Sequence, residues 1–251
     1  MLFREFLRIG TVPLRYSYLA KYEGTRLLAR AVSNADPDDI LPPEAGLALA
    51  WSPPRVRARL SILLQLDRRL ARIVSRTTEP MLGQMRLAWW RDALGQLPDQ
   101  RPRGDAVLDG IGEQWRGREA ALIALVDGWE VLIGAEQLGT KEAEAFAAGR
   151  AAPFARLAED AKPDAAARAE RAGRCWALAD AVAAISDPAE RSAFLAAAGA
   201  LGPAHGKLPG ELRGVAVLEA LARRALASGG APLMAGRGAS ITALRAAIFL
   251  T

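Results

Sequence analysis

The sequence predicts an all-α protein, and two observations lead to this prediction. Alanine, leucine and arginine dominate the 251 residues, whereas β-branched residues are sparse, and this composition favours helices. Apolar residues also recur at helical spacing in several long segments. With 51% hydrophobic and 24% charged residues, the chain can bury a large core. Because no linker-like stretch divides it, we expect a single-domain helical bundle over residues 33–251, preceded by a basic leader over residues 1–32.

The leader carries most of the net charge. It holds six basic and two acidic residues, a net charge of +4 out of +5 for the whole chain. Leucine, tyrosine and arginine are mixed in it without a clean helical period. Three interpretations stay open: an N-terminal helix, a segment that touches acidic lipid headgroups, or an extension upstream of the true start. Residues 33–44, rich in proline and aspartate, predict a loop.

The first long helix is expected to begin at Ser52-Pro-Pro, with Ser52 as its cap and Pro53 in its first turn. One apolar stripe at helical spacing supports it, formed by Val56, Leu60, Leu63, Leu70 and Val74. Asp67 lies in the middle of this stripe, which is an unusual place for a carboxylate.

A second helix is predicted around the Trp89-Trp90 pair. Pro80 suits its first turn, Thr77 or Thr78 can cap it, and Gly95 can end it. One face of this helix combines apolar residues, namely Leu82, Met85, Trp89 and Ala93, extended by Leu87, Trp90 and Leu94. Two adjacent tryptophans are costly to expose, so the helix is expected to be buried on two sides.

Arg86 falls inside that apolar arc and therefore needs a carboxylate, carbonyl groups or a bound anion. We predict that it pairs with Asp67, because the two helices are joined closely enough to be antiparallel neighbours. The simpler alternative is a core helix with one snorkelling arginine.

The rest of the chain alternates between predicted helices and loops rich in proline and glycine. The helices are expected over residues 118–138, 140–149, 151–160, 164–185, 188–199, 212–226 and 239–249, and the loops over 95–105, 200–210 and 228–238.

The composition excludes several functions. One cysteine excludes an internal disulfide and a cysteine-rich zinc site, and one histidine excludes a multi-histidine metal site. No run of 18 apolar residues predicts a spanning helix. The body of the chain is nearly neutral without the leader, so nucleic-acid binding is not expected.

Residues 84–94 resemble the Trp-Trp helix of the squalene/phytoene synthase family, whose members are all-helical class I isoprenoid synthases. The resemblance extends from about Leu47 to Leu226, and it implies a helical bundle of the isoprenoid synthase type. Enzymes of this family bind prenyl diphosphates through Mg²⁺ ions, which are held by carboxylates on two facing helices.

These carboxylate motifs are largely missing here. The family's first motif, Phe-x-Arg-x-x-Asp-Asp-x-x-Asp, falls on residues 66–75, where Arg68 matches. The three aspartate positions hold Ala71, Arg72 and Ser75.

The second motif falls on residues 177–188, where Asp180 is the remaining carboxylate and where Ala184 and Pro188 stand at acidic positions. A further family aspartate corresponds to Leu132, in the stretch that begins at Gly128, and a family tyrosine corresponds to Phe146. The resemblance therefore implies no metal ligands and no catalytic residues.

Three hypotheses for function follow. The first is a non-catalytic assembly or interaction factor, a branch of the family typified by a respiratory complex I assembly factor. The second is an active head-to-head prenyl transferase, which alone would need Mg²⁺. The third is an isoprenoid- or lipid-binding protein, in which Arg68, Arg72 and Arg86 hold an anionic group beside Trp89 and Trp90. Arg72 could equally be an ordinary solvent-facing residue.

These hypotheses imply different partners. They are an isoprenoid or lipid ligand, a protein in membrane-complex assembly, and peripheral membrane contact through residues 1–32. The expected location is the cytoplasm, with the inner membrane as the place of any peripheral contact.

Overall fold

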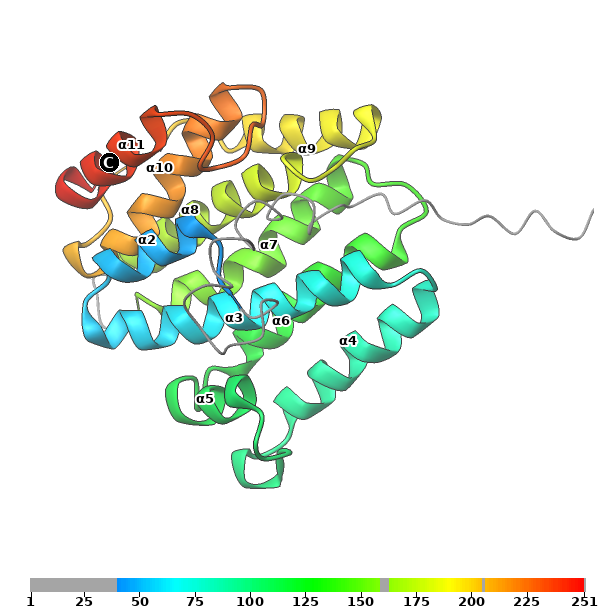
Figure 1. Cartoon of the computed structure of the whole chain (residues 1–251). Coiled ribbons are helices and arrows are strands. Elements are labelled where there is room, and N and C mark those ends of the chain that lie inside the picture. Colours follow the sequence, from blue (N-terminus) through cyan, green and yellow to red (C-terminus); the bar gives the residue numbers. More distant parts are fainter. Residues whose placement is uncertain (1–39, 159–162, 205, 251) are drawn as a thin grey trace, which may run out of the picture.

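The computed structural model of the chain describes residues 40–158, 163–204 and 206–250 (Figure 1). Within these ranges all regular secondary structure is helical, which confirms the predicted all-α class. The predicted leader and its boundary at residue 33 lie outside the described residues. The α-helices are α2 (Pro43–Trp51), α3 (Pro54–Arg76), α4 (Pro80–Gly95), α5 (Ala106–Gln114), α6 (Glu119–Gly134), α7 (Thr140–Arg156), α8 (Pro163–Val182), α9 (Pro188–Ala200), α10 (Arg213–Ala227) and α11 (Gly238–Phe249), with short 3-10 turns at Pro98–Gln100 and Gly210–Leu212.

Helix α7 lies at the centre of the bundle, between α6 and α8 (Figure 1). On one side α3 and α4 pack against α6, and on the other side α10 packs against α8. Helices α2 and α11 lie on α10, while α9 contacts both α7 and α8. One continuous cluster of buried apolar side chains joins these helices. The inward faces of α3, α7 and α8 thus meet in the interior.

Helix α2 replaces the end of the loop that was predicted over residues 33–44 and begins at Pro43. The Ser52 hydroxyl donates a hydrogen bond to the Ala48 carbonyl oxygen at 2.8 Å, so it closes α2 instead of capping α3. The next two residues, Pro53 and Pro54, have no backbone N–H that a serine oxygen could accept from. The predicted cap was therefore wrong.

The predicted bounds of the Trp-Trp helix are confirmed, since α4 begins at Pro80 and ends at Gly95. The predicted threonine caps were wrong. Thr77 ends α3, and its hydroxyl donates to the Ile73 carbonyl oxygen. Glu79 precedes α4 without a capping bond from its side chain.

Helix α7 is one helix where two were predicted, over residues 140–149 and 151–160. Gly149 does not end it but allows a close crossing with α6. A Cβ atom on Gly149 would lie 2.5 Å from the Ala124 carbonyl oxygen and 2.6 Å from the Gly128 Cα atom. Because the glycines bring α6 and α7 together, Arg150 stays in the middle of a continuous helix.

Candidate functional site

A buried ionic network occupies the interior where α3, α7 and α8 meet. The Arg150 guanidinium donates from Nε to Asp67 Oδ1 at 2.9 Å and from Nη2 to Asp67 Oδ2 at 2.7 Å. Its Nη1 donates to Asp180 Oδ2 at 3.1 Å. The side chains of Arg150, Asp67 and Asp180 are 0%, 3% and 1% exposed. Each of three helices therefore contributes one charged group to a site shielded from bulk water.

Aromatic rings enclose the guanidinium. Its central carbon lies 4.2 Å from the ring centre of Trp176, 4.6 Å from Trp129 and 5.2 Å from Phe146. Trp129 Nε1 also donates to Asp67 Oδ1 at 2.8 Å. Such rings stabilise a desolvated cation through their π faces. The bidentate pairing gives the arginine a fixed orientation.

The network contains two carboxylates and one guanidinium. Burial raises the pKa of Asp67 above its ordinary value, and the nearby Asp180 carboxylate raises it further. The charge and hydrogen bonds of Arg150 and the Trp129 N–H act in the opposite direction without cancelling the effect of burial. Arg150 lies between the two inward-facing acids and donates hydrogen bonds to both, but its single positive charge balances only one carboxylate.

The predicted Asp67–Arg86 pair was wrong. Asp67 does bind a guanidinium, but that guanidinium belongs to Arg150 on α7. Arg86 is exposed on the outer face of α4. Helix α4 carries apolar residues nearly all round, and it packs on α6 with one part of the predicted arc, namely Leu87, Trp90, Ala93 and Leu94. The other part of that arc, Leu82, Met85 and Trp89, is exposed.

The tryptophan pair is divided between the two sides of α4. Trp90 is 6% exposed, whereas Trp89 is 46% exposed. Their rings meet edge to face, with centres 5.2 Å apart. The outer face also carries Met81, Leu82 and Met85, with exposed fractions of 72%, 45% and 62%. The predicted burial on two sides was therefore wrong for Trp89, and α4 presents an apolar outer face.

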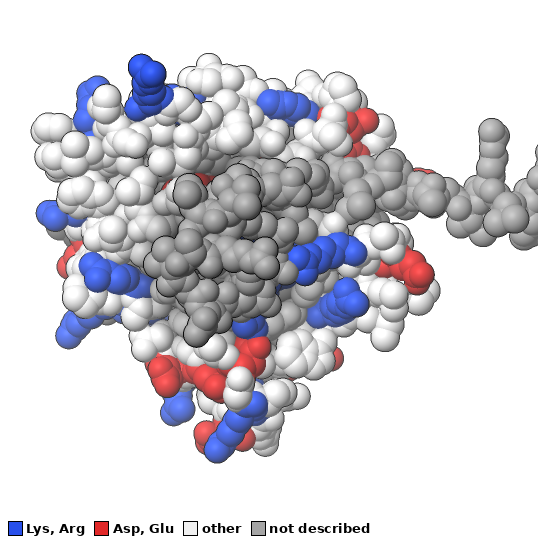
Figure 2. Space-filling model, viewed as in Figure 1, with Lys and Arg blue, Asp and Glu red and all other residues white. Residues whose placement is uncertain are grey.

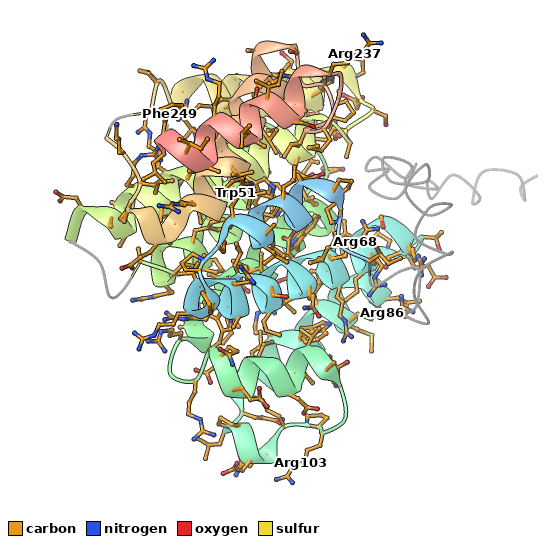
Figure 3. The ribbon with its side chains drawn as sticks, turned by 60° about the vertical axis from the view of Figure 1, so that its left-hand side comes forward. Trp51, Arg68, Arg86, Arg103, Arg237 and Phe249 are labelled. Atoms are coloured by element: carbon orange, nitrogen blue, oxygen red, sulfur yellow. The ribbon has the colours of Figure 1, made fainter. Side chains whose placement is uncertain are left out.

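The candidate anion-binding arginines lie on two helices and differ in burial. Arg68 is buried and lines a small cavity with Asp67, Asp180 and Glu44. The free volume of this cavity is about 10 Å³, the room of roughly one water molecule. Arg72 is half-buried one helical turn further along α3, and Arg86 is exposed on α4 (Figure 3). The acids in this cavity oppose a purely anionic ligand.

The positions that the predicted resemblance assigns to metal ligands hold residues of another kind. Ala71 and Ser75 are buried on α3, and the Ser75 hydroxyl donates to the Arg72 carbonyl oxygen at 3.4 Å. Ala184 is buried after α8, and Pro188 begins α9. Among the described residues, no group of three or more His, Cys, Asp or Glu side chains is arranged to hold a metal ion.

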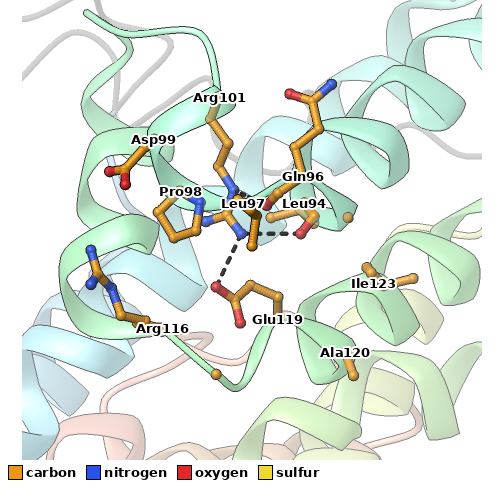
Figure 4. A pocket seen from close by; sticks show the side chains of 12 residues that line it. Leu94, Gln96, Leu97, Pro98, Asp99, Arg101, Arg116, Glu119, Ala120 and Ile123 are labelled. Atoms are coloured by element: carbon orange, nitrogen blue, oxygen red, sulfur yellow. Dashed lines mark hydrogen bonds and ion pairs between the residues drawn. The ribbon is translucent and has the colours of Figure 1, made fainter.

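A second hollow, of about 610 Å³, lies between the end of α4 and the start of α6 (Figure 4). Arg101 crosses it and caps α4 by donating to the carbonyl oxygens of Ala93, Leu94 and Gln96, each at 3.1 Å. The same side chain donates to Glu119 at 3.0 Å.

The Glu119 carboxylate is already satisfied in this hollow. Burial would raise the pKa of Glu119, but hydrogen bonds from its own N–H, Arg101 and the Gly117 N–H hold that pKa below its ordinary value. This carboxylate fills the place at the start of α6 that a bound anion would otherwise take. We therefore assign the hollow a structural role.

Cys175, the single cysteine, lies on α8 and is 2% exposed. Burial raises the pKa of its thiol to about 11. A thiol of this kind is not a nucleophile near neutral pH. His205, the single histidine, lies outside the described residues.

Comparisons with known proteins do not place the chain in a family. No family model, no curated protein and no solved structure matches it. Within the described part of the chain, no helix is long and apolar enough to cross a membrane.

Arg150 is the residue of the buried ionic network that the sequence interpretation missed. It lies on the same helical face as Ala143, Phe146, Ala147 and Phe154, all of which are buried. Asp67 and Arg86 both stand out in the sequence as charged residues within an apolar stripe. Arg150 has the same property once residues 140–156 are read as one helix.

Proposed function

We propose that the chain is a non-catalytic interaction protein, built like a squalene/phytoene synthase but without its chemistry, which binds another protein through the outer face of α4. One observation carries the non-catalytic part. Arg150 engages the two inward carboxylates of α3 and α8, Asp67 and Asp180, at distances of 2.7–3.1 Å.

The chemistry of diphosphate departure supports this proposal. A leaving diphosphate is multiply charged and needs divalent cations to neutralise it, so carboxylates must remain available to those cations. Asp67 and Asp180 already bind a fixed cation, while Ala71, Arg72 and Ser75 offer no carboxylate. Without metal ions, the reaction lacks the electrostatic stabilisation that normally dominates such catalysis.

The outer face of α4 suits a protein partner. It combines two methionines, a leucine and a tryptophan that remain exposed, namely Met81, Leu82, Met85 and Trp89. Methionine adapts to irregular surfaces, and tryptophan and arginine are enriched where protein interfaces bind most tightly. Arg86 and Asp92 are exposed beside these residues, and Figure 2 shows acidic and basic side chains close together over the α3–α4 end. Because Arg86 and Asp92 carry opposite charges, a partner surface with both acidic and basic residues would complement this face.

The catalytic part is tested with labelled farnesyl and geranylgeranyl diphosphate, with and without Mg²⁺. We expect neither squalene nor phytoene above a boiled control. Metal-dependent product would contradict the proposal and assign the chain to the active transferases. An isoprenoid recovered by mass spectrometry from the purified protein would instead favour the lipid-binding hypothesis.

The docking part is tested by site-specific photo-crosslinking from position 85 in the source cells. We expect one protein to crosslink, and the Trp89→Asp substitution to abolish this product. Leu97→Asp places the same charge on another exposed apolar residue, just after α4, and is the matched control. A crosslink that survives Trp89→Asp, or that Leu97→Asp removes equally, would overturn the assignment of α4.

A further inference from the structure

Helix α11 is packed in the reverse of the usual manner. Its inward side consists of alanines that are 1% exposed, at positions 239, 243, 246 and 247. Its large apolar residues point outward: Ile241, Leu244 and Ile248 are 63%, 48% and 57% exposed. A surface helix ordinarily buries its large apolar side chains and exposes polar ones. The residues at 241, 244 and 248 follow the i, i+3, i+7 spacing and so form one continuous outer stripe.

The sequence around this stripe carries charges of one sign. From residue 220 to residue 251 the sequence contains four arginines and no aspartate or glutamate. Arg237 and Arg245 are exposed. Figure 3 shows Arg237 and Phe249 at opposite ends of α11, and Phe249 is 58% exposed. In Figure 2 the surface over α11 is largely uncharged, with basic side chains at its upper margin. The face therefore complements an acidic apolar surface.

We propose that α11 lies on an anionic lipid surface, with its aliphatic stripe among the acyl chains and Arg237 and Arg245 at the phosphate groups. An interfacial helix of this kind buries its apolar side by several ångströms and gains affinity from anionic headgroups. Arginine can reach phosphate while its stem stays in the apolar layer. The alanine side keeps the helix seated on α10.

Two other occupants fit this surface less well. A second copy of this chain would bring the same arginines toward each other with no facing carboxylate, and like charges oppose such an interface. A folded protein partner is better suited by the methionine and tryptophan face of α4 than by the aliphatic, convex stripe of α11.

The test is sedimentation of the full-length protein with vesicles of phosphatidylglycerol and phosphatidylcholine, in equal parts, and with vesicles of phosphatidylcholine alone. We expect binding to the acidic vesicles that weakens as salt is raised. Arg237→Gln with Arg245→Gln should weaken it by about fivefold per arginine. Ile241→Asp with Ile248→Asp should weaken it at least about tenfold.

Leu97→Asp places the same charge on an exposed apolar residue outside α11. It is the matched control and should leave binding within about twofold of the original value. The arginine pair does not touch the core, so it keeps the test valid if the aspartate pair reduces folding. Absence of binding to acidic vesicles at low salt would overturn the proposal. So would binding that persists in both α11 variants, which would assign it to another part of the chain. A dimer seen by light scattering and abolished by Ile241→Asp would assign the stripe to self-association.

Discussion

Among the described residues, an interior and an exterior site each place one arginine between two carboxylates, and the two sites differ in almost everything else. Arg150 joins Asp67 and Asp180 in the interior, with side chains that are at most 3% exposed. Arg91 of α4 binds Asp127 at 2.6 Å and also Glu130, and these three side chains are 34%, 53% and 31% exposed. The acids of the exterior site lie one turn apart on a single helix, α6. Those of the interior site lie on two helices, α3 and α8.

This difference teaches what burial does to the same set of charges. Exposed ion pairs are screened by water and salt and contribute about 0–1 kcal/mol. In the interior, loss of one partner leaves a charge without solvent, which costs about 3–5 kcal/mol. The interior site also links three helices, whereas the exterior site links α4 to α6 only. We infer that the interior arginine specifies how the bundle assembles and the exterior one adds little.

The largest expected effect is that of Arg150→Met. Methionine keeps much of the volume but leaves Asp67 and Asp180 without their cation. We expect the free energy of unfolding to fall by about 3–5 kcal/mol, measured by urea denaturation with circular dichroism. A loss below about 1 kcal/mol would mean that the network is not a structural centre.

A smaller loss of stability is expected from Gly149→Ala. This substitution displaces α7, the helix that carries Arg150, without removing any charge from the interior site. The new Cβ atom would lie 2.5 Å from the Ala124 carbonyl oxygen. The helices must then separate, at a cost of about 1–3 kcal/mol. Combined with Arg150→Met, the two losses should be less than additive, because a shifted α7 has already weakened the network. Full additivity would show that the close crossing and the ionic network are independent.

Asp67→Asn tests the electrostatic side of the comparison. The pKa of Asp67 is raised by burial in the folded state from its ordinary value of 3.8. As pH rises from 3.8 toward that raised pKa, the unfolded chain releases a proton that the native protein still holds, so native stability falls. The difference in unfolding free energy between the original protein and the asparagine variant should therefore decrease over this window. An increase over the same window would show that Arg150 outweighs burial.

Arg91→Met should have the smallest effect and is the matched exterior control for Arg150→Met. We expect a loss of about 0–1 kcal/mol that shrinks further in high salt, because the site is open to solvent. Thermal melts at low and high salt would measure it. A loss comparable to that of Arg150→Met would remove the distinction between the two sites.

The elements were largely predictable from local signals, because proline and glycine mark helix ends directly. Pro80 and Gly95 fixed the ends of α4 in this way. Glycine also misled where its role is tertiary: Gly149 resembled a helix end but serves the crossing of α6 and α7. Ser52 looked like a cap because a serine before prolines usually is one, yet its hydroxyl turns back to α2.

The sequence predicted that Asp67 has a buried cationic partner, but it did not predict which residue that partner is. The position of Asp67 within an apolar stripe correctly implied a buried cationic partner. Which arginine it binds depends on the rotation of α4 about its axis, and apolar residues nearly all round that helix leave its rotation undetermined by periodicity. Trp89 and Trp90 divide in the same manner for the same reason. The packing of neighbouring helices decides which arginine binds Asp67 and which of the two tryptophans is buried. The local sequence does not contain this information.

The burial of Cys175 has a practical consequence. Since its thiol is 2% exposed, and since burial raises its pKa to about 11, a thiol reagent can reach it only when α8 opens. The chain has no second cysteine to confuse the signal. Pulsed alkylation followed by mass measurement would therefore time the opening events of the native bundle, without adding any label to the protein. Cys175 is thus a natural probe of local unfolding of α8, the helix next to the one that carries Arg150.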